Sequence, residues 1–242
     1  MELAGRVALV TGGARRVGAA IVRALAAKGM TVAVHYGSSG AAAEALVAEL
    51  RAAGRIAEAF DADLREVAAA RALPARVAER LGRLDVVVNS AANMLEAPVE
   101  GVTPELWEET FALNLRAPFF VAQAALPHLR AARGKVVNIA DLAGLEPWPR
   151  YVAHCTSKAG VVMLTRALAR ALAPDVTVNA VAPGAVLLPD DWGEEARRHF
   201  VETTPLQRLG SAEDVAQAVV YLLEADYVTG EVLVVDGGRL LR

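Results

Sequence analysis

Two hydrophobic periodicities succeed each other along almost the whole chain. Short, continuous apolar runs rich in valine are typical of strands that are buried on both faces of a sheet. Longer stretches place apolar residues three or four apart, as Ile21 and Leu25 are, which is typical of one face of a helix. The predicted strands are Val7–Val10, Thr31–His35, Ile56–Phe60, Leu84–Val88, Lys135–Ile139, Val176–Val181 and Val232–Val235. The predicted helices are Val17–Lys28, Ala41–Ala53, Leu64–Leu81, one opened by Thr103 and Pro104 that carries Phe111 and Leu115, Val152–Leu172 and Ala212–Leu223.

This alternation predicts the fold class. Strands that alternate with helices pair in parallel, and right-handed crossovers place helices on both faces of the sheet. We therefore expect an α/β fold of the Rossmann type, a doubly wound parallel sheet of about seven strands, formed by residues 1–242 as one domain. The rhythm breaks only at Ala185–Thr204, a long segment after a strand end that we interpret as a lid over a substrate.

Composition narrows the class of protein further. Apolar residues make up 55% of the chain, charged residues 22%, and the net charge is −3, so the sequence predicts a large core and no basic surface for nucleic acid. We predict no signal peptide, and we expect no membrane span because the sequence contains no apolar run of sufficient length. Its one cysteine, Cys155, excludes an internal disulfide and a cysteine-based metal site. We expect a cytoplasmic protein whose partner is a small-molecule substrate.

A glycine-rich turn follows the first predicted strand and opens the first predicted helix. Its glycines let the backbone approach a phosphate closely, and the helix offers N–H groups and a positive dipole to a pyrophosphate. The turn reads Thr11-Gly12-Gly13-Ala14-Arg15-Arg16-Val17-Gly18. In this context of strand and helix it predicts a dinucleotide site.

The end of the second strand indicates which dinucleotide binds. NAD-binding folds place an acidic residue there, on the ribose hydroxyl. Here Tyr36 is followed by Gly37, Ser38 and Ser39, and Arg15 lies near in the predicted fold, so we predict NADP(H) rather than NAD(H). The alternative is that the two serines only begin the next helix.

Further segments, in order and spacing, resemble the short-chain dehydrogenase/reductase family over essentially the whole chain. Besides the glycine turn, they are Asp61-Ala62-Asp63-Leu64, Asn89-Ser90-Ala91-Ala92, Asn114, Ser157-Lys158-Ala159-Gly160, Pro183-Gly184 and Val235-Asp236-Gly237-Gly238. The resemblance implies catalytic roles for Asn114 and Lys158. With the turn, it implies cofactor contacts by Gly12, Arg15, Arg16, Val17, Gly18, Tyr36, Ser38, Ser39, Asp63, Leu64, Asn89, Ala91, Lys158, Pro183, Gly184 and Val186.

Within that family the chain is most similar to pteridine reductases, including the dihydromonapterin reductase type. The similarity rests on Arg16 in the glycine turn, on His35-Tyr36, on Asp141 thirteen residues before His154, and on the tail from Tyr227 to Arg239. It implies substrate contacts by Arg16, Met94, Asp141 and Tyr151.

The sequence departs from that subgroup at the reactive centre. Four residues before Lys158 the family has its catalytic tyrosine, and this chain has His154; Met94 stands where pteridine reductases have an aromatic residue. A nearby ammonium favours neutral imidazole, a poor acid, whereas a carboxylate in contact favours the imidazolium, a competent proton donor. Our hypothesis is a catalytic site formed by Asp141, His154 and Lys158. In this site His154 delivers a proton, and Asp141 orients the His154 ring and favours its charged form.

Three functions follow from these observations. The first is NADPH-dependent reduction of a C=N or C=O bond in a pterin-like substrate. The second, suggested by Met94, is reduction of another small carbonyl or oxidation of an alcohol. The third, suggested by His154, is dinucleotide binding without redox turnover.

Two further expectations concern the lid and the assembly. Asp190 and Asp191 beside Trp192 favour a solvated lid over a metal site, because no histidine accompanies them. The family resemblance implies a homo-oligomer, usually a tetramer, built through the small apolar residues of Pro104–Pro127 and Val152–Leu172.

Overall fold

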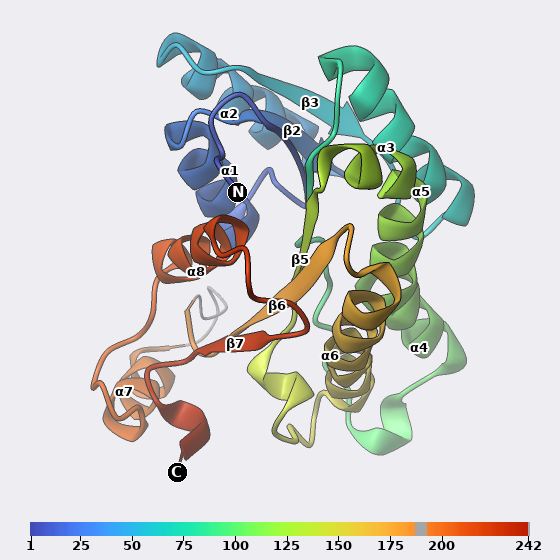
Figure 1. The fold of residues 1–242 in the computed structure, drawn as a ribbon. Helices are drawn as coiled ribbons and strands as arrows, with labels where there is room; N and C mark the ends of the chain where they lie inside the picture. Colours follow the sequence, from blue (N-terminus) through green and yellow to red (C-terminus); the bar gives the residue numbers. More distant parts are fainter. Residues whose placement is uncertain (187–192, 242) are drawn as a thin grey trace.

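Seven parallel strands form one sheet through the middle of the molecule (Figure 1). The structure, a computed structural model, describes residues 1–186 and 193–241. The strand order is β3-β2-β1-β4-β5-β6-β7. The strands are β1 (Val7–Thr11), β2 (Thr31–Tyr36), β3 (Ala57–Asp61), β4 (Val86–Asn89), β5 (Lys135–Ile139), β6 (Thr177–Pro183) and β7 (Val232–Val235).

Helices cover both faces of the sheet, as Figure 1 shows, with α1, α2 and α8 on one face and α3, α4, α5 and α6 on the other. The helices are α1 (Arg16–Ala27), α2 (Gly40–Ala52), α3 (Val67–Leu81), α4 (Pro104–Phe111), α5 (Ala117–Ala132), α6 (Val152–Leu172), α7 (Glu194–Thr203) and α8 (Ala212–Glu224). Short turns of helix are η1 (Val99–Gly101), the π-helical η2 (Ala112–Arg116), η3 (Leu142–Gly144) and η4 (Arg239–Leu241). The predicted doubly wound α/β fold is confirmed.

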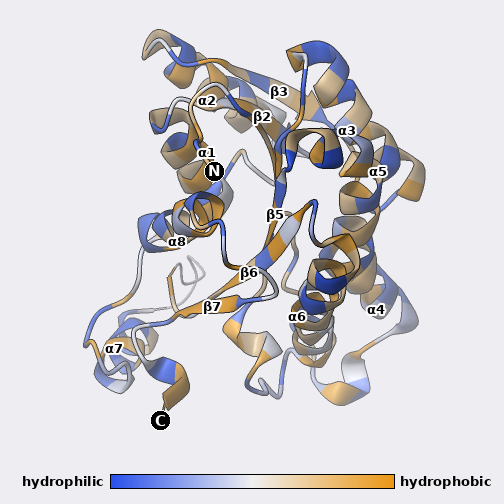
Figure 2. Cartoon of the chain, viewed as in Figure 1, coloured by the Kyte–Doolittle hydropathy of each residue, from blue (hydrophilic) through white to orange (hydrophobic). Residues whose placement is uncertain are grey.

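The period of two in a strand explains why the sheet has two cores. Ala8 and Val10 of β1 pack into the cluster under α1 and α8, whereas Val7 and Leu9 pack into the cluster under α3 and α5. All four side chains are nearly or fully buried, so both faces of β1 are apolar and its sequence shows no alternation of apolar and polar residues. In Figure 2 strands of the sheet, β7 for example, are coloured largely as hydrophobic.

The ends of several elements follow the predicted chemistry. The Thr103 side chain caps α4 by accepting the N–H of Leu106, with Pro104 in the first turn. Ser211 opens α8 through a capping box with Asp214. The third helix begins at Val67 rather than at Leu64, because Asp63 accepts the N–H of Arg65 and closes a turn there.

The predicted lid contains an element that the sequence analysis did not predict. Residues 194–203 form α7, which opens with Glu194 and Glu195, carboxylates that suit a helix N-terminus. The predicted lid residues Asp190, Asp191 and Trp192 lie outside the described residues. Among the described helices, none has the combined length and apolar character needed to cross a membrane.

The strand order reverses direction between β1 and β4, which are neighbours in the sheet although two strands separate them in the chain. Crossovers leave this point in opposite directions, which opens a crevice at the carboxyl ends of the strands. The glycine turn after β1 lies at this crevice.

Candidate active site

A cavity of about 980 Å³ lies along the carboxyl ends of the strands. It extends from the glycine turn after β1 and the ends of β2 and β3, past β4 and β5, to the end of β6 and to η4. Most of the predicted site residues line it: Gly12, Arg15, Arg16, Val17, Gly18, Ser38, Ser39, Asp63, Leu64, Ala91, Met94, Asp141, His154, Lys158, Pro183, Gly184 and Val186. The fold thus brings residues from six strand ends to one continuous space.

The glycine turn packs directly against the end of β4. Gly12 has a φ of +62°, and a Cβ there would lie 2.8 Å from Cα of Ala91. A Cβ at Gly18 would collide with the carbonyl oxygen of Gly12. At the start of α1, Arg15 makes no side-chain cap and no acidic residue occupies the first turn. Neither a capping side chain nor an acidic residue of the first turn therefore competes with an anion at this helix N-terminus.

A buried histidine holds this turn in place. His35, at the end of β2, accepts the N–H of Gly12 on Nδ1 at 3.0 Å, and its Nε2 donates to the carbonyl of Ala62 at 3.1 Å. Burial is the main cause that lowers the pKa of His35 to about 4, so the ring is neutral in the tautomer that these two bonds require. One imidazole thus ties the ends of β2 and β3 to the glycine turn.

No carboxylate stands at the end of β2, where Ser38 and Ser39 line the cavity beside Arg15. Ser39 occupies the N-cap position of α2, but its side chain makes no capping hydrogen bond. The Asp63 carboxylate, further along the cavity, is held by the guanidinium of Arg65. This end of the cavity therefore presents hydroxyl groups and a cation rather than a free acid.

His154 lies in the middle of the cavity wall, on the first turn of α6, and is almost fully buried. Its Nδ1 lies 3.1 Å from the carbonyl oxygen of Asn93, and its Nε2 lies 3.4 Å from Oδ2 of Asp141. Because a carbonyl only accepts, Nδ1 carries a proton, and Nε2 is the nitrogen that can exchange one. The Asp141 carboxylate is fixed in turn, since its Oδ1 accepts the N–H of Ala143 at 2.9 Å.

Lys158 follows His154 by one turn of α6, so both side chains project from the same face of the helix. Its Nζ donates to the carbonyl oxygen of Ile139, at the end of β5, at 2.8 Å. Burial lowers the pKa of Lys158, and the charge of Asp141 opposes that shift. The amine is thus anchored on the sheet while it lines the cavity.

Asn114 stands behind this centre rather than in the cavity lining. It lies in η2, the π-helical turn between α4 and α5. Its Oδ1 accepts the N–H of Asn93, and its Nδ2 donates to the Asn93 carbonyl at 3.0 Å and lies 3.5 Å from Nδ1 of His154. Asn114 therefore positions the carbonyl that fixes the His154 ring.

Three predicted contact residues do not line the cavity. The side chain of Asn89 donates to Oδ1 of Asn138 within the sheet, because it points from the end of β4 toward β5. The Tyr36 ring packs beside Gly40 at the start of α2. The Tyr151 hydroxyl donates to Glu96, which also pairs with Arg150, and this draws the tyrosine to an exposed cluster. The contacts predicted for these three residues stay predictions.

The cavity also contains residues that the sequence analysis did not single out as contacts. Trp148 lies near the reactive centre, with its ring centroid 6.4 Å from that of His154 and the two planes 19° apart. Phe200 of α7 and Arg239 of η4 line the far end. Arg239 had a sequence signal, since it directly follows the loop after β7, at the same edge of the sheet as the predicted site.

The comparisons with known proteins agree with this arrangement. Residues 12–239 match a family model described as enoyl-(acyl carrier protein) reductase. A Streptomyces violaceoruber protein, whose name assigns it as ketoacyl reductase 2 of the granaticin polyketide synthase, is 40% identical over 243 residues, 97% of this chain and 96% of its own.

Two solved structures are similar over nearly their whole length. A blue fluorescent protein from a metagenomic library, in complex with NADPH, has a TM-score of 0.92 and 39% identity and covers 99% of both chains. FolM alternative dihydrofolate reductase 1 from Brucella suis, in complex with NADP, has a TM-score of 0.93 and 34% identity over 100% of this chain and 97% of its own. The sequence match and the shared architecture show that the chain belongs to the short-chain dehydrogenase/reductase family.

Proposed function

We propose that this protein is an NADP(H)-dependent oxidoreductase that reduces a C=N or C=O bond of a small, planar, pterin-like substrate. The observation that carries the proposal is the contact of Asp141 with Nε2 of His154, beside Lys158, in the same cavity as the glycine turn. A proton donor and a dinucleotide cradle in one space are the two parts that such a reduction needs.

The residues of this chain fit the proposed cofactor. The close approach of Gly12 to Ala91 leaves a backbone cradle that any side chain would fill, and the open N-terminus of α1 suits a pyrophosphate. Ser38, Ser39 and Arg15 suit a 2′-phosphate, which an acid at the end of β2 would repel. When bound, the cofactor supplies hydride. The NADPH and NADP complexes of the two similar structures support this choice.

His154 is the proposed proton donor. Its Nδ1 is held by the Asn93 carbonyl, so Nε2 is the nitrogen that delivers the proton toward the cavity. The Asp141 carboxylate at 3.4 Å stabilises the charged ring, and the anchored Lys158 beside it disfavours that charge. In the proposed reaction the ring gives up the proton of Nε2 to the substrate, while Asp141 keeps the ring oriented.

Two observations bear on the substrate. Trp148 provides a flat face next to His154, which compensates for the absence of an aromatic residue at Met94, and FolM is named as a dihydrofolate reductase. Reduction of another carbonyl is the second candidate, favoured by the ketoacyl reductase name of the Streptomyces relative.

The deciding experiment is a turnover screen with the purified protein. Loss of NADPH absorbance is followed with dihydropterin and dihydrofolate, and then with a panel of ketones that includes a β-ketoacyl thioester. Faster turnover of the pterins supports the first candidate, and ketone turnover alone supports the second. Tight NADPH binding without turnover, unchanged in His154→Tyr, would instead indicate a binding protein without redox activity.

The expected homo-oligomer is part of the proposal. An apolar groove separate from the cavity runs between α4, η2, α5 and α6, where Trp107 and Phe111 stack at 4.6 Å and Met163 is exposed. A second copy of the chain packed there would bury this groove, which sedimentation of the purified protein would detect as a mass above that of one chain.

A further inference from the structure

Trp148 lies in the loop between η3 and α6 and lines the reactive end of the cavity, half-buried. Its indole ring lies beside His154, with the ring centroids 6.4 Å apart and the two planes 19° from parallel. Met94, which also lines the cavity, has a flexible side chain without a flat face. Trp148 therefore presents a large flat surface next to the proposed proton donor.

A hydrogen bond to Glu146 fixes the direction of this ring. The indole Nε1 donates to Oε1 of Glu146 at 2.9 Å, and this N–H is the one hydrogen-bonding group of a tryptophan side chain. The same oxygen lies 4.0 Å from Nε of Arg239, so a cation of η4 also holds the carboxylate. Glu146 does not itself line the cavity, so it acts on a molecule there through the Trp148 ring.

The loop that carries both side chains is anchored to α6, the helix of the reactive histidine. The main-chain N–H of Trp148 donates to Sγ of Cys155 at 3.4 Å. Two residues before Glu146, Gly144 packs so closely on α6 that a Cβ there would lie 2.8 Å from the carbonyl carbon of Lys158. The ring and its carboxylate partner thus have fixed positions relative to the reactive centre.

A flat ring fixed in this way distinguishes substrates by shape. A conjugated ring can lie against the indole with its centroid about 4.5–7 Å away, whereas a saturated ring is puckered and makes contact through a few hydrogen atoms only. Because the indole is already ordered in the folded protein, such a contact costs little conformational entropy of Trp148. The arrangement therefore favours planar molecules beside His154.

We propose that Trp148 is a specificity-determining residue whose indole face binds the ring of a planar, conjugated substrate, and that Glu146 is the positioning residue that holds this indole. The inference rests on the proposed function, because it places the reacting bond at His154. It narrows the substrate class to compounds whose C=N or C=O bond belongs to a flat conjugated ring or is attached to one. Carbonyl compounds with saturated rings are the poorer substrates.

The test uses two ketones with the same carbon skeleton. Acetophenone has a flat ring and cyclohexyl methyl ketone a saturated one, so the ratio of their kcat/KM values with NADPH reports the effect of planarity. Their intrinsic reactivities differ, but this difference cancels when the ratios of two protein variants are compared. Trp148→Leu should lower the ratio by about 3- to 10-fold, the size expected for a lost aromatic stack, and Trp148→Phe should retain most of it.

Binding is measured separately from reduction. Protein loaded with NADP⁺ cannot reduce either ketone, so ligand-observed NMR gives both dissociation constants without turnover. Acetophenone should bind to the wild type about 3- to 10-fold more tightly than its saturated analogue, and Trp148→Leu should remove this preference.

Variants of Glu146 test whether it acts through the indole. Glu146→Gln removes the negative charge beside Arg239 but keeps an oxygen that can accept the indole N–H, so the ratio should stay within about twofold of the wild type. Glu146→Leu removes the acceptor and should lower the ratio in the same direction as Trp148→Leu. In a Trp148→Phe background, where the ring has no N–H, Glu146→Leu should have no further effect.

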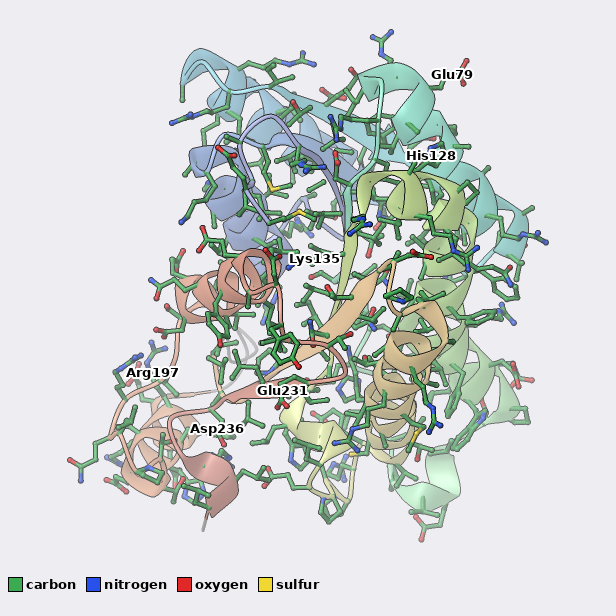
Figure 3. All side chains as sticks on the ribbon, viewed as in Figure 1. Glu79, His128, Lys135, Arg197, Glu231 and Asp236 are labelled. Atoms are coloured by element: carbon green, nitrogen blue, oxygen red, sulfur yellow. The ribbon has the colours of Figure 1, made fainter. Side chains whose placement is uncertain are left out.

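Glu79 provides a matched control for the loss of a carboxylate. Glu79, labelled in Figure 3, is an exposed residue of α3 that does not line the cavity. Glu79→Leu should leave the ratio of the two ketones unchanged, and a change as large as that of Glu146→Leu would overturn the role of Glu146. An NADPH affinity close to that of the wild type verifies in each variant that the cofactor end is folded.

The outcomes distinguish this inference from the proposed function. Equal ratios in the wild type and in Trp148→Leu would overturn the role of Trp148 even if reduction is observed. An effect of Glu146→Leu that persists in the Trp148→Phe background would contradict positioning through the indole. Binding of acetophenone that depends on Trp148, without any NADPH oxidation, would support the indole face and refute the reductase. Neither binding nor reduction of acetophenone would overturn both.

Discussion

The two ends of the cavity are built by different means. At the cofactor end the backbone forms the site: glycines bring strand β4, the turn and α1 together, and His35 fixes them through main-chain groups. At the reactive end side chains from separate elements form the site, with His154 between Asp141 and Asn93. A site formed by the backbone tolerates few residue types, whereas a site formed by side chains tolerates many. Substitutions can therefore change the reaction at the reactive end, but they cannot change the glycine turn at the cofactor end.

Gly18→Ala should have the largest effect and tests the rigidity of the cofactor end. The added methyl would collide with the Gly12 carbonyl, and neither backbone can move without opening the turn. We expect NADPH binding to be lost at millimolar concentration and stability to fall by about 3 kcal/mol or more. Isothermal titration and chemical denaturation measure both. Ala19→Gly, the neighbouring change in α1, should cost only about 1 kcal/mol and retain binding.

His154→Ala tests whether the reactive end contributes chemistry separately from binding. Removing a general acid lowers the rate by about 10²- to 10⁴-fold. We expect a loss of that size in kcat for the best substrate of the screen, with NADPH affinity within a few-fold of the wild type. Asp141→Asn should produce a similar loss, because the ring then lacks the carboxylate that stabilises its charge. Full activity in His154→Ala would remove this residue from the mechanism.

The pH dependence of stability tests the role of His35. Its pKa is about 4 in the folded protein and near 6.5 when unfolded, so the unfolded chain binds more protons between these values. Stability should therefore fall as pH decreases from 6.5 to 4, by up to about 3 kcal/mol for this group. Urea denaturation at several pH values measures the slope. His35→Asn, whose side chain does not titrate, should flatten it, and an unchanged slope would assign the loss to other groups.

Ser39→Ala should have the smallest effect and refines the choice of cofactor. If the hydroxyl contacts the 2′-phosphate, its removal should weaken NADPH binding by about 3- to 10-fold and leave NADH binding unchanged. Equal losses for both cofactors would assign Ser39 to the start of α2 instead. The comparison requires only two binding titrations on one variant.

The sequence predicted those elements that are determined by residues close together in the chain. Apolar runs such as Val7–Val10 define buried strands, and Thr103 and Ser211 define helix starts through their own side chains. The glycine turn was predictable because the fold leaves few residue types possible there. The boundary at Leu64 was missed because the turn depends on the bond of the Asp63 side chain to Arg65, which periodicity does not reveal.

The side-chain directions at the site were harder to predict. Asn89 and Tyr151 stand at the predicted strand and helix ends, yet Asn138 and Glu96 draw their side chains elsewhere. Arg239 lies beside Glu146, a residue far from it in the chain, and no local pattern links these two positions. Pairings of this kind are set by the packed structure, so they lay beyond a reading of one sequence.

Because of the π-helical turn at Ala112–Arg116, the reactive end depends on the number of residues in this turn as well as on which residues they are. One residue changes the direction of a helical side chain by about 100°. Deletion of a residue of this turn that precedes Asn114 would turn the Asn114 amide away from Asn93, and the His154 ring would lose this support although every residue of the site remained in the chain. The wider hydrogen-bonding spacing of the π-helical turn thus sets the direction in which the Asn114 side chain points.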